Sequence, residues 1–173
     1  MLKHKRVEAH LATFGNNVIA KAKQNLRKRN ASSGLSKSLE YDLKISLRSF
    51  EFSISMETYG KFLDKGVSGV KRKHNTPYSY RSKGGKRGLK GMPPPKAFDK
   101  WNIRRGIAPR NSKGQFGSRK QTNFLIAKSI FEKGIKPTNF LTKPFEDEFK
   151  HLPDQLVEKY ALDVEEFLTF ILK

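Results

Sequence analysis

A run of cationic side chains in the middle of the chain has the clearest chemical meaning. Between Lys65 and Phe131 there are 18 lysines or arginines and a single acid, Asp99. Eight basic residues and two tyrosines of this run stand close together: Lys71, Arg72, Lys73, Tyr78, Tyr80, Arg81, Lys83, Lys86, Arg87 and Lys90. Because cations neutralise phosphates and tyrosine rings stack on bases, the pattern suits nucleic acid. The same charges also suit acidic surfaces of neighbouring subunits, and both interpretations stay open.

Other residue types that could do chemistry lack the necessary spacing. The chain has no cysteine, and its four histidines show no metal-ligand spacing. Asp64, Glu51 and Glu57 are the carboxylates from which a site could be assembled, but a lone Asp before Lys-Gly more often caps a turn. Residues 83–88 contain glycines and lysines without the strand, GK[ST] ending and helix of a phosphate-binding loop. We therefore predict no catalytic residue, metal site or cofactor, and no enzymatic activity.

No helix-turn-helix, zinc-finger or RNA-recognition signature accompanies the basic run, so sequence-specific readout is not expected. The net charge of +20 is unevenly spread, with +24 in residues 1–140 and −4 in residues 141–173. This polarity suits head-to-tail attraction between copies, or it reflects a solvated acidic face on the last helix. The N-terminal sequence lacks an apolar run for a signal peptide, and no stretch of about 18 apolar residues could span a bilayer. The expected location is therefore a cytosol-like compartment, away from membranes.

Hydrophobic periodicity predicts a small α+β fold. Apolar residues recur every three or four positions from Lys5 to Arg29, which predicts an amphipathic helix. Strict alternation over residues 39–45 and again over residues 50–56 predicts an antiparallel hairpin with one buried face. The first helix is the obvious element to cover that face. A short helical turn at residues 58–64 should stop at Gly66.

Residues 67–93, which we call the basic arm, lack apolar periodicity and are expected to be extended, without regular structure, until an assembly orders them. Inserted helices should then begin at Pro94 or Pro95 with the apolar stripe Ala97, Phe98 and Trp101, and at Thr122 or Asn123. Gly106 and Gly134 should end them. Residues 135–141 could form a strand beside the hairpin, although two interpretations compete there. Helices should follow from Pro144 and Pro153. The predicted organisation is one domain over residues 1–173, with a body at about 1–66 and 94–173 that carries the arm.

The order of these pieces resembles the tail-completion (neck, or head–tail connector) proteins of long-tailed bacteriophages. The resemblance extends from the N-terminal helix to about Glu148. Residues 33–39 (SGLSKSL) resemble the family's small-residue run before its first strand, and residues 59–66 (YGKFLDKG) resemble the turn that follows its hairpin. Residues 93–101, 106–107 and 124–134 are similar to a helical insertion found in many members. Residues 137–141 (PTNFL) resemble the segment that returns the chain to the sheet.

This resemblance implies a structural virion protein that forms a ring of six or 12 copies between the portal or connector and the tail. The ring would let DNA pass and would be assembled in the cytoplasm of the host bacterium. The basic arm would reach onto adjacent subunits or connector rings. Alternatively, the arm would face the lumen and make transient contact with genomic DNA. A tail terminator protein and a nonspecific nucleic-acid-binding protein are the other readings.

Overall fold

The computed structural model describes residues 4–28, 33–46, 49–85, 88–108, 110 and 113–171. The chain divides into two compact units, one formed by residues 1–60 with 139–173 and the other by residues 61–138. We call them the α+β unit and the basic unit. The sequence-based division into a body and an arm placed the boundaries at residues 66 and 94. In the structure the basic arm and the helices that follow it belong to the same unit.

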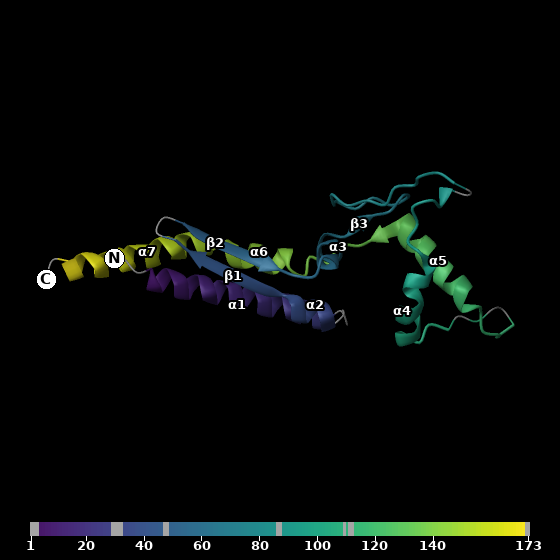
Figure 1. The fold of residues 1–173 in the computed structure, drawn as a ribbon, viewed down its shortest axis with the longest axis horizontal. Coiled ribbons are helices and arrows are strands. Elements are labelled where there is room, and N and C mark those ends of the chain that lie inside the picture. The colour runs from purple at the N-terminus through teal and green to yellow at the C-terminus, as the bar shows by residue number, and fades with distance from the viewer. Residues whose placement is uncertain are drawn as a thin grey trace. The chain divides into compact units, whose positions relative to one another are not determined.

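The α+β unit is built on helix α1 (Lys5–Lys28) and the hairpin of β1 (Glu40–Ile45) and β2 (Phe50–Ser55) (Figure 1). The strands pair antiparallel, with Leu43 opposite Phe52 and Tyr41 opposite Ile54. These positions are partly buried while their neighbours along each strand are exposed, as alternation predicts. The predicted helix, the hairpin and the α+β class are therefore confirmed. The hairpin connection includes residues 47 and 48, which lie outside the described residues.

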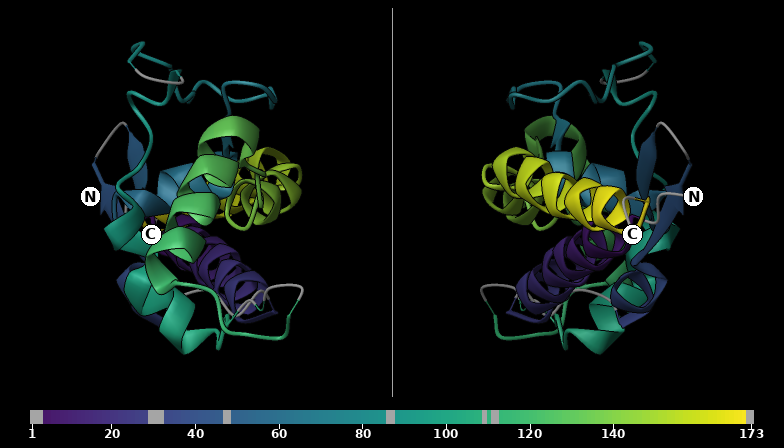
Figure 2. Two further views of the ribbon diagram at one scale, coloured as in Figure 1. Left: turned by 90° about the vertical axis from the view of Figure 1, so that its right-hand side faces the viewer. Right: turned by 90° about the vertical axis from the view of Figure 1, so that its left-hand side faces the viewer.

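The core of this unit forms where α1 meets the sheet and two C-terminal helices, α6 (Thr142–Phe149) and α7 (Leu152–Ile171). Phe14 is 5% exposed and makes edge contacts with Phe52 and Phe145. Figure 2 shows α7 alongside α1. The two helices run antiparallel, because Val7 contacts Asp163 while His10 contacts Gln155. The helices predicted from Pro144 and Pro153 are confirmed, and α2 (Ser33–Ser38) is a further helix that the sequence analysis did not predict.

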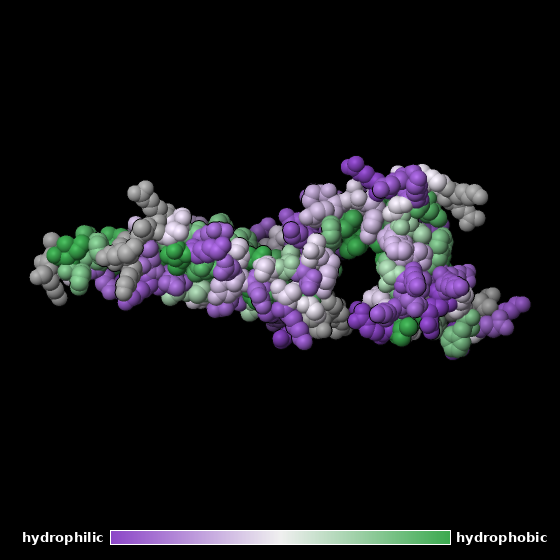
Figure 3. Space-filling view, in the orientation of Figure 1, coloured by the Kyte–Doolittle hydropathy of each residue, from purple (hydrophilic) through white to green (hydrophobic). Residues whose placement is uncertain are grey.

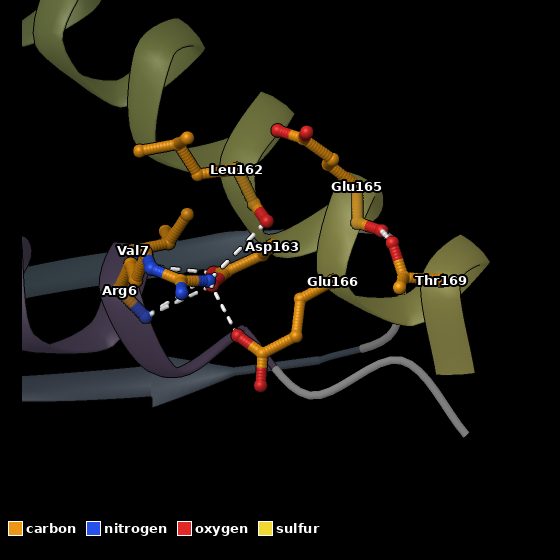
Figure 4. Close-up of polar contacts among 7 residues, drawn as sticks. All are labelled: Arg6, Val7, Leu162, Asp163, Glu165, Glu166 and Thr169. Atoms are coloured by element: carbon orange, nitrogen blue, oxygen red, sulfur yellow. Dashed lines mark hydrogen bonds and ion pairs between the residues drawn. The ribbon is translucent and has the colours of Figure 1, made fainter.

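A buried carboxylate joins the first turn of α1 to the second half of α7. Asp163, 3% exposed, accepts hydrogen bonds from the backbone N–H groups of Arg6 (3.3 and 3.2 Å) and Val7 (3.3 Å) (Figure 4). The Arg6 guanidinium also donates to Asp163 at 3.2 Å and pairs with Glu166 at 2.6 Å. The first N–H groups of a helix lack partners within the helix and carry partial positive charge. Asp163 therefore acts as a long-range N-cap.

The basic unit contains α3 (Tyr59–Lys65, which begins in the α+β unit), β3 (Val67–Ser68), a 3₁₀ turn η2 (Pro95–Phe98), α4 (Asp99–Arg104), α5 (Arg119–Lys133) and β4 (Gly134–Ile135). The predicted ends at Gly66, Gly106 and Gly134 agree with these bounds. The start of α5 was predicted wrongly, because Thr122 and Asn123 lie inside the helix and are buried. Strand β4 pairs with β3 and not with the hairpin, so that alternative is also wrong.

Candidate interaction surface

The first part of the basic arm is held to the C-terminal end of α5. The N–H group of Val70 donates to the carbonyl of Phe131 at 2.9 Å, and those of Lys71 and Arg72 donate to the carbonyl of Glu132 at 2.9 and 3.1 Å. The last carbonyl groups of a helix have no hydrogen-bond donor within the helix, and here the N–H groups of the arm act as the donors. The basic residues near this end also suit the negative end of the helix dipole. Residues 69–85 form no regular helix or strand, as predicted, but hydrogen bonds to α5 hold the first part of the arm in place.

Beyond these contacts with α5, the arm also forms hydrogen bonds within itself. Ser68 donates its N–H to the carbonyl of Tyr78 and accepts from the N–H of Tyr80, both at 2.8 Å, which forms a parallel bridge between Ser68 and Ser79. The Ser68 side chain, from a residue that is 3% exposed, bonds the backbone of His74. Like-charge repulsion predicted extension, but backbone bonds to α5 and within the loop outweigh it here.

The two tyrosines of the arm face the protein. Tyr78 lies edge-on to Phe62, with ring centroids 4.8 Å apart, and Tyr80 lies 6.0 Å from the ring of buried Phe131. Both tyrosines are partly buried. Burial raises the pKa of the Tyr80 phenol. The structure therefore assigns these rings a packing role, in place of the stacking platform that the sequence suggested.

The basic residues of the arm divide into one paired lysine and a set of exposed cations. Lys71 forms an ion pair with Glu132 at 3.0 Å. This hydrogen bond lowers the pKa of the Glu132 carboxyl, and the charges of Lys71, Lys128 and Lys133 act in the same direction. Arg72, Lys73, Arg81, Lys83 and Lys90 are exposed and form no ion pair within the part of the chain that the structure describes. Lys86 and Arg87 lie outside the described residues.

The lowered pKa of Glu132 leads to a pH-dependent stability. The ionised carboxylate is favoured in the folded state, so its contribution is present above the unfolded value, near 4.5, and is lost as the pH falls through the folded value. We expect wild type to have a higher melting temperature than Glu132→Gln at pH 7, and the gap to close below pH 4.5. Trp101 fluorescence in the basic unit would record it. A gap that stayed constant with pH would contradict the role of the charge.

In the remainder of the arm, residues 82–84 are hydrogen-bonded to residues 88–90. Lys83 donates its N–H to the carbonyl of Lys90 at 2.8 Å, and Lys90 donates to that of Gly84 at 3.0 Å. The Ser82 hydroxyl donates to the carbonyl of Gly88 at 2.6 Å. The exposed side chains of Lys83 and Lys90 are thus carried by a segment whose backbone is hydrogen-bonded, which reduces the entropy lost when a partner binds.

The structure assigns nearly all of the net charge to one unit. Residues 61–138 contain 21 lysines or arginines and three acids, a balance of +18, whereas the α+β unit carries +2. Every described lysine or arginine of the basic unit is exposed except Lys128, which is partly buried. Of the acids, Asp64 is 3% exposed, Glu132 pairs with Lys71, and Asp99 accepts from Asn123 at 3.2 Å. Figure 3 shows hydrophilic surface over α4 and the arm. The surface presented by this unit is strongly cationic.

Helix α4 carries a second group of cations. The sequence predicted a helix here but not which of its side chains are exposed. Two residues of the predicted apolar stripe are exposed, Trp101 (39%) and Ala97, whereas Phe98 is partly buried. The buried residue is Asn102, 2% exposed, whose side-chain amide donates to Asn123 of α5. The hydrogen bond between Asn102 and Asn123 therefore determines which face of α4 is buried, and Lys100 and Arg104 are exposed. The only sign of this contact in the sequence was an asparagine in each of the two helices, Asn102 in α4 and Asn123 in α5.

The other carboxylates singled out from the sequence are divided between the two units. Glu51 and Glu57 are exposed in the α+β unit, while Asp64 is buried in the basic unit. No group of three His, Cys, Asp or Glu residues in the described ranges could hold a metal ion. Among the same residues, no helix is both long enough and apolar enough to cross a membrane.

Comparisons of this chain with protein families, with curated proteins and with solved structures each gave no match.

Proposed function

We propose that this chain is a structural protein of the neck of a long-tailed bacteriophage. Copies of the chain, six or 12, form a ring that joins the portal or connector to the tail and lets DNA pass. The proposal rests on the order of the sequence motifs described above and on one structural observation. That observation is the separation of a nearly neutral α+β unit from a unit of charge +18 whose three acids are buried or paired.

This separation supports an assembly role because an isolated cationic surface repels copies of itself and attracts an anionic partner. In a ring, acidic surfaces of adjacent subunits, connector rings and tail proteins are available to the cations, and the central DNA is a further polyanion. The exposed arm cations Arg72, Lys73, Arg81, Lys83 and Lys90 belong to this surface. We place the protein in the virion, after assembly in the bacterial cytoplasm, and assign it no enzymatic activity, cofactor or membrane contact.

Mass measurement of the purified chain tests the ring. We expect a species of six or 12 copies in light scattering, and a ring with a central opening in negative-stain electron microscopy. The arm is tested by replacing Lys83, Lys86, Arg87 and Lys90 with alanine, which should weaken ring assembly or attachment of heads to tails. A chain that stays monomeric over the whole concentration range contradicts the proposed function, and normal joining by the variant contradicts the role of the arm.

Nonspecific binding to nucleic acid is the second candidate, and the charge of +18 is the observation that favours it. A small monomer that shifts the mobility of any duplex would support it in place of the ring. In that case log K should fall linearly with log salt, and Arg72→Ala with Lys73→Ala should reduce the slope by about one per cation. Nonspecific binding to nucleic acid gives the paired strands of the α+β unit no role, and we therefore rank this function second.

A further inference from the structure

Helix α7 presents an apolar face that the chain leaves exposed. Val157, Ala161, Val164, Leu168 and Ile171 follow one another at intervals of four, three, four and three residues. We call these residues the α7 stripe. Val157 is 71% exposed, Leu168 is 51% exposed and Ile171 is 58% exposed, whereas Val164 is partly buried. Alternating intervals of three and four are the spacing of a helix that packs against another surface along its length.

The stripe is separate from the face that holds α7 in its own unit. That inner face contributes buried Leu152 to the core, together with partly buried Leu156, and carries Asp163 against α1. On a helix of 3.6 residues per turn, the inner residues lie to one side of the stripe. The packing of the α+β unit therefore does not explain the apolar character of the stripe.

The other edge of the stripe is acidic. Asp154, Glu158 and Glu165 follow this edge, and all three are exposed. Figure 4 shows the Glu165 carboxylate directed away from Arg6. Between Leu152 and Ile171 the helix carries five acids and one lysine. Pairing of two α7 stripes would bring these like charges together, so charge complementarity favours a surface that is both apolar and cationic.

Helix α4 in the basic unit has that composition. Trp101 is 39% exposed and Ile103 is 56% exposed, next to exposed Lys100, Arg104 and Arg105. We propose that the α7 stripe of one copy binds the α4 surface of a second copy. This inference rests on the proposed function and names the contact that builds the ring. Because the two surfaces differ, the contact is head-to-tail, and repetition of such a contact closes into a ring when the rotation permits.

A charge-reversal cycle on the full chain tests this contact. One variant carries Glu158→Lys and Glu165→Lys on α7, and a second carries Lys100→Glu and Arg104→Glu on α4. Each should weaken self-association by at least about tenfold, because like charges then face each other. The chain that combines all four changes should recover association, since opposite charges are restored. Analytical ultracentrifugation over a range of concentrations measures the effect.

Glu51→Lys and Val157→Ser complete the design. Glu51 is exposed on β2 and not on α7, so this charge reversal should leave association unchanged. Val157→Ser removes apolar surface without changing charge and should weaken association. Circular dichroism checks that each variant keeps the helices. If wild type forms rings and every variant forms them equally, the contact is wrong while the ring stands. If wild type stays monomeric at all concentrations, or only the α7 pair matters, the pairing is overturned.

Discussion

Replacing Asp163 with alanine should lower the free energy of unfolding of the α+β unit by about 2–3 kcal/mol. The carboxylate is 3% exposed and accepts from two backbone N–H groups of α1 and from the Arg6 guanidinium. Alanine leaves these N–H groups without an acceptor at a point where water has limited access. It also removes the negative charge that faces the positive end of the α1 dipole.

Urea unfolding followed by two signals measures this effect in the right unit. Far-ultraviolet circular dichroism reports both units, whereas the fluorescence of Trp101, the single tryptophan, reports the basic unit. We expect Asp163→Asn, which keeps one acceptor oxygen, to lose about 1 kcal/mol. Glu166→Ala removes only the exposed partner of Arg6 and should lose less than about 0.5 kcal/mol. Equal stability of Asp163→Ala and wild type would show that the cap contributes nothing.

The second large effect is expected from Gly134→Ala, which should destabilise the basic unit by about 3 kcal/mol or more. Gly134 has φ +77°, a conformation that an L side chain rarely adopts. A Cβ atom placed there would lie 2.1 Å from the carbonyl oxygen of Val67 and 2.5 Å from the nitrogen of Gly69. Both neighbours are backbone atoms of the β3 segment, so they cannot move aside as a flexible side chain would.

Gly106→Ala is the matched control for this prediction. Gly106 also has a positive φ, +60°, but nothing lies within 4 Å of its would-be Cβ. That variant should show only the conformational penalty, about 1–2 kcal/mol. Denaturant unfolding monitored by Trp101 fluorescence compares the two. If both glycines give the same loss, the close approach of β3 and β4 does not limit the packing of this unit.

The hairpin shows what local pattern can predict. In β1 and β2 the alternation of apolar and polar side chains matches the observed register, in which Leu43 faces Phe52. A shift of one residue would expose the whole apolar set, so the pattern determines the pairing strongly. The helix ends at Gly66, Gly106 and Gly134 could also be predicted from the sequence, because a positive φ at the end of a helix favours glycine.

The α4–α5 region shows where local pattern fails. Apolar spacing predicted a stripe of Ala97, Phe98 and Trp101, but the buried side chain of α4 is Asn102, which bonds Asn123. The energy of that contact depends on a residue 21 positions away. The cap predicted at Thr122 or Asn123 failed for the same reason, since both side chains have roles inside the fold.

The sequence by itself determined the α+β class, the amphipathic helices, the hairpin and the strong excess of positive charge, because these follow from composition and from periodicities of 2 and 3.6. Only the tertiary structure decided that Asp163 caps α1, that the basic arm caps α5, and that the arm and the helices after it share one unit. Each of these depends on backbone groups that every residue possesses or on partners far apart in the chain. A pattern of side chains along the sequence does not encode where those groups meet.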